Sequence, residues 1–135
     1  MRVTYLVLIA MLFSSITTAN ARPYPDRVGV CSTFKGETKL SSDICLISYW
    51  TAVGGRERTL KTATKTYVAS ENDVKDDVIL TLNGIKAESY YRHAAFLNVL
   101  SEDDDASGWN AVTAAYEEEE LFYCYKSKGV DICYN

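Results

Sequence analysis

Histidine and proline are scarce in this chain of 135 residues, which contains one His and two Pro. Every mechanism that needs an imidazole therefore has to use His93. Few prolines, 12% aromatic residues and 24% charged residues exclude long intrinsic disorder and low-complexity scaffolds. Hydrophobic runs are short too, and none approaches the ~20 residues of a membrane-spanning helix. What remains is one ordinary globular domain, because the chain is too short for a multidomain enzyme.

The first residues have the three parts of a secretory signal peptide. Arg2 gives a basic start, residues 5–13 are apolar, and Ala19-Asn20-Ala21 is a small-x-small cleavage site. A buried N-terminal strand or helix is the alternative, but such an element rarely carries this cleavage pattern. We therefore predict a signal peptide over residues 1–21, a flexible leader over 22–27 and a single domain over 28–135, secreted to the extracellular space.

All four cysteines follow the predicted cleavage site. The secretory route is oxidising, so two disulfides are expected, although three pairings are possible. Structural zinc is the alternative, but the spacing has no C-x-x-C pair and the His is remote, so we predict no metal. The expected disulfide residues are Cys31, Cys45, Cys124 and Cys133.

The hydrophobic pattern predicts several strands separated by short turns. The expected strands cover residues 28–34, 44–53, 59–68 and 78–82, with an acidic connection over 71–77. The end of the chain reads as a hairpin over 121–126 and 130–134, turning around Lys128-Gly129. In that register Cys124 stands opposite Cys133, which makes a local disulfide conceivable.

Two segments read as helices. Over residues 85–100 the apolar spacing becomes three and four, which is typical of a buried helical stripe; its members are Tyr90, His93, Ala94, Phe96, Leu97 and Leu100. A second helix is expected near Trp109, with Ser107 as N-cap and Trp109, Val112 and Tyr116 on one side. The predicted fold is α+β, an antiparallel sheet with two helices packed on one face, held by two disulfides.

Nothing in the sequence forms a convincing catalytic set. His93 falls on the apolar stripe, and Glu88, five residues earlier, is poorly placed as a partner on a helix. The acidic runs 102–105 and 117–120 lack the alternating ligands of a calcium loop and read as solvated charge. We predict no catalytic residue and no cofactor. The alternative is a small secreted hydrolase or nuclease-like enzyme that uses His93 with an acidic partner.

Tyrosine is the unusual component, with ten in the chain. In the predicted hairpin Tyr123, Tyr125 and Tyr134 share one face, and Cys124 and Cys133 share the other. Either the hairpin is covered on both sides, or its tyrosine face is a recognition surface, since Tyr is enriched at interfaces. We take Tyr123, Tyr125 and Tyr134 as the candidate binding surface. The net charge of −4 disfavours a nucleic-acid partner.

Two short stretches carry a resemblance to a known group. The leader Arg22-Pro23-Tyr24-Pro25 running to Val30-Cys31, and the segment Cys45-Leu46-Ile47-Ser48-Tyr49-Trp50, resemble the four-cysteine maize-induced secreted proteins of smut fungi. These are small secreted effectors of plant pathogens. The resemblance implies secretion during colonisation of a host and a role in virulence. Because the sequence also lacks a catalytic set, we expect a non-enzymatic virulence factor that binds a host protein or other host macromolecule, outside the host cell or after uptake into it.

Overall fold

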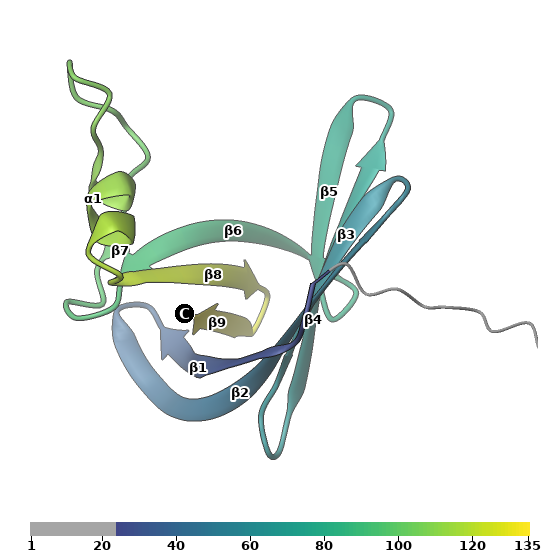
Figure 1. Cartoon of the computed structure of the whole chain (residues 1–135). Coiled ribbons are helices and arrows are strands. Elements are labelled where there is room, and N and C mark those ends of the chain that lie inside the picture. The colour runs from purple at the N-terminus through teal and green to yellow at the C-terminus, as the bar shows by residue number, and fades with distance from the viewer. Residues whose placement is uncertain (1–23) are drawn as a thin grey trace, which may run out of the picture.

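The computed structural model describes residues 24–135, which form nine strands and one short helix (Figure 1). The predicted signal peptide and the first two residues of the predicted leader lie outside the described residues. The elements in chain order are β1 (Arg27–Lys35), β2 (Thr38–Ala52), β3 (Gly55–Lys61), β4 (Thr66–Val74), β5 (Asp77–Leu82), β6 (Ile85–His93), β7 (Val99–Leu100), α1 (Ala111–Glu117), β8 (Leu121–Ser127) and β9 (Val130–Tyr134).

The strands form one antiparallel sheet that closes on itself. Their order is β5-β4-β3-β2-β1-β9-β8-β6-β7, and β5 also pairs with β6. Most neighbours are consecutive in the chain, since tight turns connect them. Only β7 stands outside the closed ring, as an edge strand beside β6.

Two strands change partners and divide the sheet into two layers. Residues 38–47 of β2 pair with β1, whereas residues 46–52 pair with β3. β6 pairs with β5 through residues 85 and 86 only and then with β8 through residues 87–93. As Figure 1 shows, β3, β4 and β5 run across the direction of β1, β8 and β9. Strands that pass from one layer to the other form the corners of such packings.

The β8–β9 hairpin is covered on both faces. Tyr125, Ile132 and Tyr134 belong to the main core cluster between the layers. On the other face the hairpin contributes to a second cluster, whose buried members are Phe34, Phe122, Cys124 and Cys133. Alternation along the two strands sends side chains to both clusters.

Both disulfides are local. Cys31 and Cys45 join β1 to β2 with Cα atoms 5.8 Å apart, and Cys124 and Cys133 join β8 to β9 with Cα atoms 4.0 Å apart. The prediction of two disulfides is confirmed, and so is the pairing of Cys124 opposite Cys133 in the hairpin register. Two bonds of this kind indicate an oxidising compartment. Among residues 24–135, no helix is long and apolar enough to cross a membrane.

The predicted α+β class with two packed helices is wrong, since most described residues are in strands and the one helix is short. Residues 85–100 form β6, a turn and β7. The misleading residue is Arg92, which is 3% exposed and points to the second cluster beside Tyr90. A charged residue at a buried strand position hides the period of two, so the remaining apolar residues mimic a helix.

The second helix exists but is shorter than predicted. It begins at Ala111, and its N-cap is Asn110 rather than Ser107, because the Asn110 side chain accepts from the Thr113 N–H at 2.8 Å. Trp109 and Tyr116 are 47% and 61% exposed, so the expected aromatic face does not pack on the sheet.

The predicted strand over 59–68 is two strands. Thr62 ends the first run, because its hydroxyl accepts from the N–H of Thr64 and Lys65 and its own N–H donates to the Lys65 carbonyl. The predicted acidic connection over 71–77 is mostly strand as well. Its turn is confined to Lys75 and Asp76, which both have positive φ, as a tight hairpin turn requires.

Candidate binding cleft

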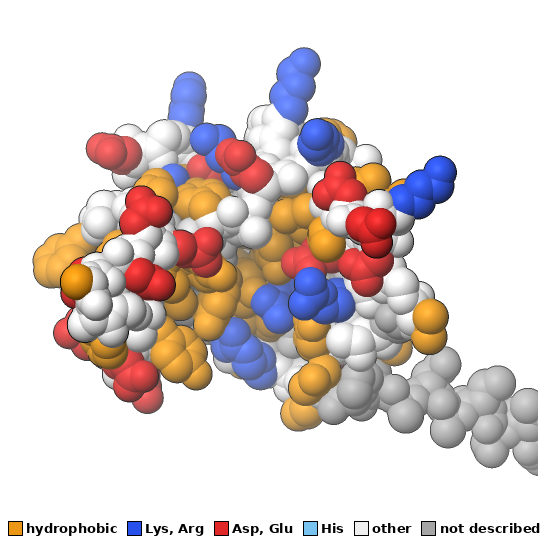
Figure 2. Space-filling model, turned by 90° about the horizontal axis from the view of Figure 1, so that it is seen from above, with side chains coloured by type: hydrophobic (Ala, Val, Ile, Leu, Met, Phe, Trp, Pro, Cys, Tyr) orange, Lys and Arg blue, Asp and Glu red, His pale blue; other side chains and the backbone are white. Residues whose placement is uncertain are grey.

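A crevice runs between the two layers. It consists of three adjoining cavities of about 210, 600 and 690 Å³. The first two share Tyr49, Arg58, Tyr123 and Tyr134, which we call the tyrosine–arginine cleft. Figure 2 shows this side of the molecule hollowed, with hydrophobic side chains in the hollow and charged side chains beside it.

Strand register assembles the cleft. Tyr49 on β2 pairs with Arg58 on β3, and Tyr123 on β8 pairs with Tyr134 on β9. The Arg58 guanidinium lies 4.7 Å from the centroid of the Tyr49 ring and 5.0 Å from that of Tyr134. Rings hold a guanidinium well because their faces are negative. Arg58 thus bridges the two layers, and the Arg27 guanidinium lies 6.0 Å from the centroid of the Tyr134 ring.

The tyrosine rings of β8 and β9 form a stack. The Tyr134 ring centroid lies 5.6 Å from that of Tyr123 and 6.0 Å from that of Tyr125, with interplanar angles of 23° and 20°. Tyr123 is half-buried, whereas Tyr125 and Tyr134 are buried. The three residues predicted as a binding surface therefore come together at the wall of a cleft, and the two buried rings are out of reach of a flat partner surface.

Charge in the crevice is unevenly compensated. Arg56 forms an ion pair with Glu71 at 2.6 Å. Among residues 24–135, no carboxylate forms an ion pair with Arg27 or Arg58. The central cavities therefore carry positive charge that no described acidic side chain neutralises.

One buried polar atom at the cleft has no partner. Tyr134 is 1% exposed, and its hydroxyl makes no hydrogen bond within the described part of the chain. A buried hydroxyl left without a partner costs about 1–3 kcal/mol. Burial raises the pKa of Tyr125 and of Tyr91, which also line the cleft, so both phenols are neutral at physiological pH.

A second polar cluster adjoins the cleft through Tyr90, which lines the smaller cavity, and its hydrogen bonds are made within the fold. Arg92 donates to the Tyr90 hydroxyl at 2.9 Å, to the Leu97 carbonyl at 3.0 Å and to the Gly36 carbonyl at 2.8 Å. It also pairs with Asp131, which accepts a hydrogen bond from Tyr90. Burial, and then the bond to Asp131, raises the pKa of Tyr90.

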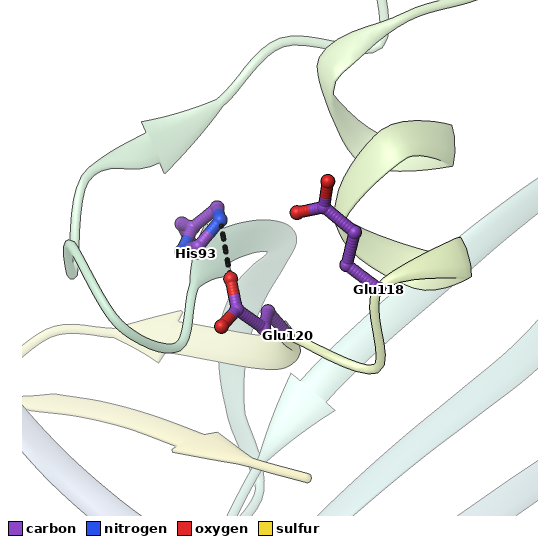
Figure 3. Close-up of side chains that lie close together, drawn as sticks. All are labelled: His93, Glu118 and Glu120. Atoms are coloured by element: carbon purple, nitrogen blue, oxygen red, sulfur yellow. Dashed lines mark ion pairs between the residues drawn. The ribbon is translucent and has the colours of Figure 1, made fainter.

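His93 lies at the end of β6, away from the helical position predicted for it. Its Nε2 is 3.0 Å from a carboxylate oxygen of Glu120, and its side chain is 12% exposed (Figure 3). Sequence reasoning missed this partner because Glu120 is distant in the chain and comes from the segment after α1. His93 lines none of the three cavities of the crevice.

The His93 surroundings fit a hydrogen-bonded pair better than a metal centre. Ligand atoms of His93, Glu118 and Glu120 lie within 4.8 Å of one another. However, His93 Nδ1 accepts from the N–H of Ala95 and Phe96 at 3.2 and 3.4 Å. Nδ1 is then unprotonated and the proton is on Nε2, where it is donated to Glu120. A histidine that binds metal through Nε2 instead donates from Nδ1.

The third cavity is a gap between β5 and β6. It is lined by residues 77–80 of β5 and 86–89 of β6. The two strands pair only at Thr81–Lys86 and Leu82–Ile85, next to the Asn83-Gly84 turn, and then diverge into different layers. The outer edge of β5 over residues 77–80 therefore has no neighbouring strand.

Sequence reasoning missed the arginines of the cleft. Arg56 and Arg58 alternate with Glu57 and Thr59, and that pattern was a usable signal for a strand with one polar inner face. Comparison with known proteins adds nothing further: no protein-family model, no curated protein and no solved structure matches this chain.

Proposed function

We propose that this chain is a secreted binding protein that acts on a protein of a host, as an effector-like virulence factor. The observation that carries the proposal is the open edge of β5. Closed sheets protect their edges, and an exposed apolar edge is a template for a further strand. The expected partner is an extended segment of a host protein, added alongside β5.

The side chains at this edge support an intermolecular contact. Val78 and Ile79 are 53% and 43% exposed although they are adjacent, so both faces of the strand are accessible there. The Val78 N–H donates to the carboxylate of Asp77 at 2.9 Å, which substitutes for the acceptor of a missing strand. A partner segment would replace that local bond and cover the apolar side chains.

Secretion and a host target rest on separate support. The two disulfides fit the oxidising secretory route and the extracellular space. The host and the role in virulence come from the resemblance of two short sequence stretches to effectors of plant-pathogenic fungi. Action outside the host cell and action after uptake are both compatible with this proposal.

The test is affinity capture from plant host tissue, using residues 22–135 and mass spectrometry. The double variant Val78→Lys/Ile79→Lys should lose the captured protein, since two lysines repel an added strand. Ile44→Lys, on the exposed face of β2, is the matched control and should capture normally. Equal capture by the edge variant, or no protein captured by the wild type, contradicts the proposal.

The hydrolase alternative is favoured by one observation, the contact of His93 with Glu120. Such a pair is the base and orienting group of many hydrolases. It lies outside the crevice, and in the described residues no serine or cysteine nucleophile hydrogen bonds to His93. We therefore rank it second.

A further inference from the structure

We propose that the tyrosine–arginine cleft is a separate binding site for a small aromatic carboxylate. The site lies between the layers, whereas the proposed protein contact lies at the β5 edge, so this inference goes beyond the proposed function. Three properties of the cleft specify the ligand: its unpaired positive charge, its stacked rings and its size.

The charge specifies an anion. Arg58 has no ion pair with a carboxylate in residues 24–135, and its guanidinium is held in place by the Tyr49 and Tyr134 rings. A guanidinium that is already oriented loses little freedom when it binds, and its planar fork matches a carboxylate. Arg27 adds positive charge to the cavity of about 600 Å³, which Arg58 also lines.

The carboxylate of Glu71 favours a ligand with one negative charge over a ligand with two. Glu71 lines the smaller cavity together with Arg56 and is paired with it at 2.6 Å. A dianion such as a phosphate monoester would be repelled by that carboxylate at short range. A single negative charge meets about half of that repulsion, which favours a carboxylate.

The Tyr134 hydroxyl supplies the second polar contact. It is buried and lacks a hydrogen-bond partner among the described residues, and the centroid of the Tyr134 ring lies 5.0 Å from the Arg58 guanidinium. Polar groups left unsatisfied in a folded protein call for an explanation, and a bound acceptor is one. A carboxylate has two oxygens, so one can contact Arg58 while the other accepts from Tyr134 once the ring shifts enough to open its hydroxyl, which is closed off in this structure.

The walls and the volume specify a flat ring. Tyr49 and Tyr123 are half-buried and line both cavities, so their rings offer aromatic surface on which another planar ring packs well. Cavities of about 210 and 600 Å³ suit a small molecule.

Isothermal titration with 2-naphthoate as the probe tests the site in residues 22–135. Two further probes separate the requirements: 2-naphthamide has the ring without the charge, and acetate has the charge without the ring. We expect 2-naphthoate to bind at least tenfold more tightly than either. Comparable binding of 2-naphthamide, or no binding of 2-naphthoate, overturns the proposal.

Variants locate the binding. Arg58→Gln should weaken 2-naphthoate about ten- to hundredfold, as expected for a lost charged hydrogen bond. Tyr134→Phe removes only a hydroxyl without a partner, so it keeps the fold and should still weaken binding severalfold. Lys61→Gln, an exposed residue on the same strand as Arg58, is the matched control and should bind like the wild type.

The outcomes are distinct from those of the β5-edge experiment. If either cleft variant binds 2-naphthoate as tightly as the wild type, the carboxylate site is wrong. If Arg58→Gln does not fold, Tyr134→Phe decides alone. Val78→Lys/Ile79→Lys should bind 2-naphthoate normally, and a loss there would also overturn the placement of the site in the cleft.

Discussion

Arg92 on β6 and Asp131 on β9 form an ion pair at 3.4 Å across the intervening strand β8, with side chains only 3% and 7% exposed. The Arg92 guanidinium also lies 4.3 Å from the centroid of the Phe34 ring and donates to the carbonyl of Gly36 in the turn after β1. One side chain therefore connects β6, β9 and the β1–β2 turn. Arginine is usually found at the protein surface, but here the loss of its side chain should destabilise the fold.

We predict that Arg92→Met lowers the free energy of unfolding by about 3–5 kcal/mol, because it leaves the Asp131 carboxylate buried without its cation. Urea unfolding followed by circular dichroism measures the loss. Arg56→Gln breaks an exposed ion pair and serves as the control, for which we expect no clear change. Similar midpoints for both variants would mean that Asp131 is adequately satisfied by Tyr90 alone.

Stability should fall at alkaline pH through Tyr90. Burial and the bond to Asp131 raise its pKa in the folded protein. Its contribution is complete below the ordinary tyrosine pKa of about 10 and is lost as the pH rises from there toward the folded-state pKa. Tyr90→Phe should therefore flatten the decline of the melting temperature above pH 10. The exposed Tyr116 gives the control variant Tyr116→Phe, which should keep the wild-type slope.

Zinc should not stabilise the protein through His93. The Nδ1 atom accepts backbone hydrogen bonds, so Nε2 carries the proton that a metal would have to displace. We expect the same melting temperature with and without added Zn²⁺, since a ligand stabilises only if it binds the folded state. A rise in melting temperature that His93→Gln abolishes would disprove the hydrogen-bonded pair and establish a metal site.

His93→Gln also distinguishes host-protein binding from the hydrolase alternative. It should leave host-protein capture unchanged, because His93 is remote from the β5 edge, and it should cost about 0.5–1.5 kcal/mol of stability through its lost hydrogen bonds. Loss of biological activity in a variant that remains folded and captures the host protein like the wild type would favour the hydrolase.

Each disulfide should contribute a moderate amount of stability. The sequence separations are 14 and 9 residues, for which loop entropy gives about 3 and about 2.5 kcal/mol. Cys31→Ala/Cys45→Ala and Cys124→Ala/Cys133→Ala should therefore lose comparable amounts in urea unfolding. Reduction of both bonds should lower the melting temperature strongly, since total stabilities are about 5–15 kcal/mol. An unchanged melting temperature after full reduction would contradict a structural role.

Local features of the fold could be predicted from the sequence. The turns at Gly54 and Gly84 and the opposition of Cys124 to Cys133 depend on residues close in the chain. The prediction of a helix over 85–100 was wrong because the ion pair between Arg92 and Asp131 is a long-range contact. A reader of the sequence who does not know this ion pair places Arg92 on a solvent-facing position, because burying an unpaired charge is costly. The apolar residues around it then fit a helical period of three and four better than a strand period of two.

The candidate binding cleft could likewise be predicted only in part, because it combines residues that are close in the chain with residues that are distant. Tyr123, Tyr125 and Tyr134 could be singled out because they alternate within one hairpin. Their partner Arg58 lies on β3, which is distant from the hairpin in sequence and in strand order. The closure of the sheet brings them together, and nothing local in the sequence signals that closure.

The pairing of β1 with β9 joins the first strand of the sheet to the last, which bears on the order of folding. Ser32, which is fully buried, pairs with Cys133, so the strand that emerges early cannot find one of its neighbours until the last strand has been made. Non-local pairings of this kind form slowly. Until then the β1 edge is open, and the Cys31–Cys45 bond, which needs only β1 and β2, can already hold that hairpin together. We therefore expect the Cys31–Cys45 disulfide to stabilise the β1–β2 hairpin until β9 can pair with β1.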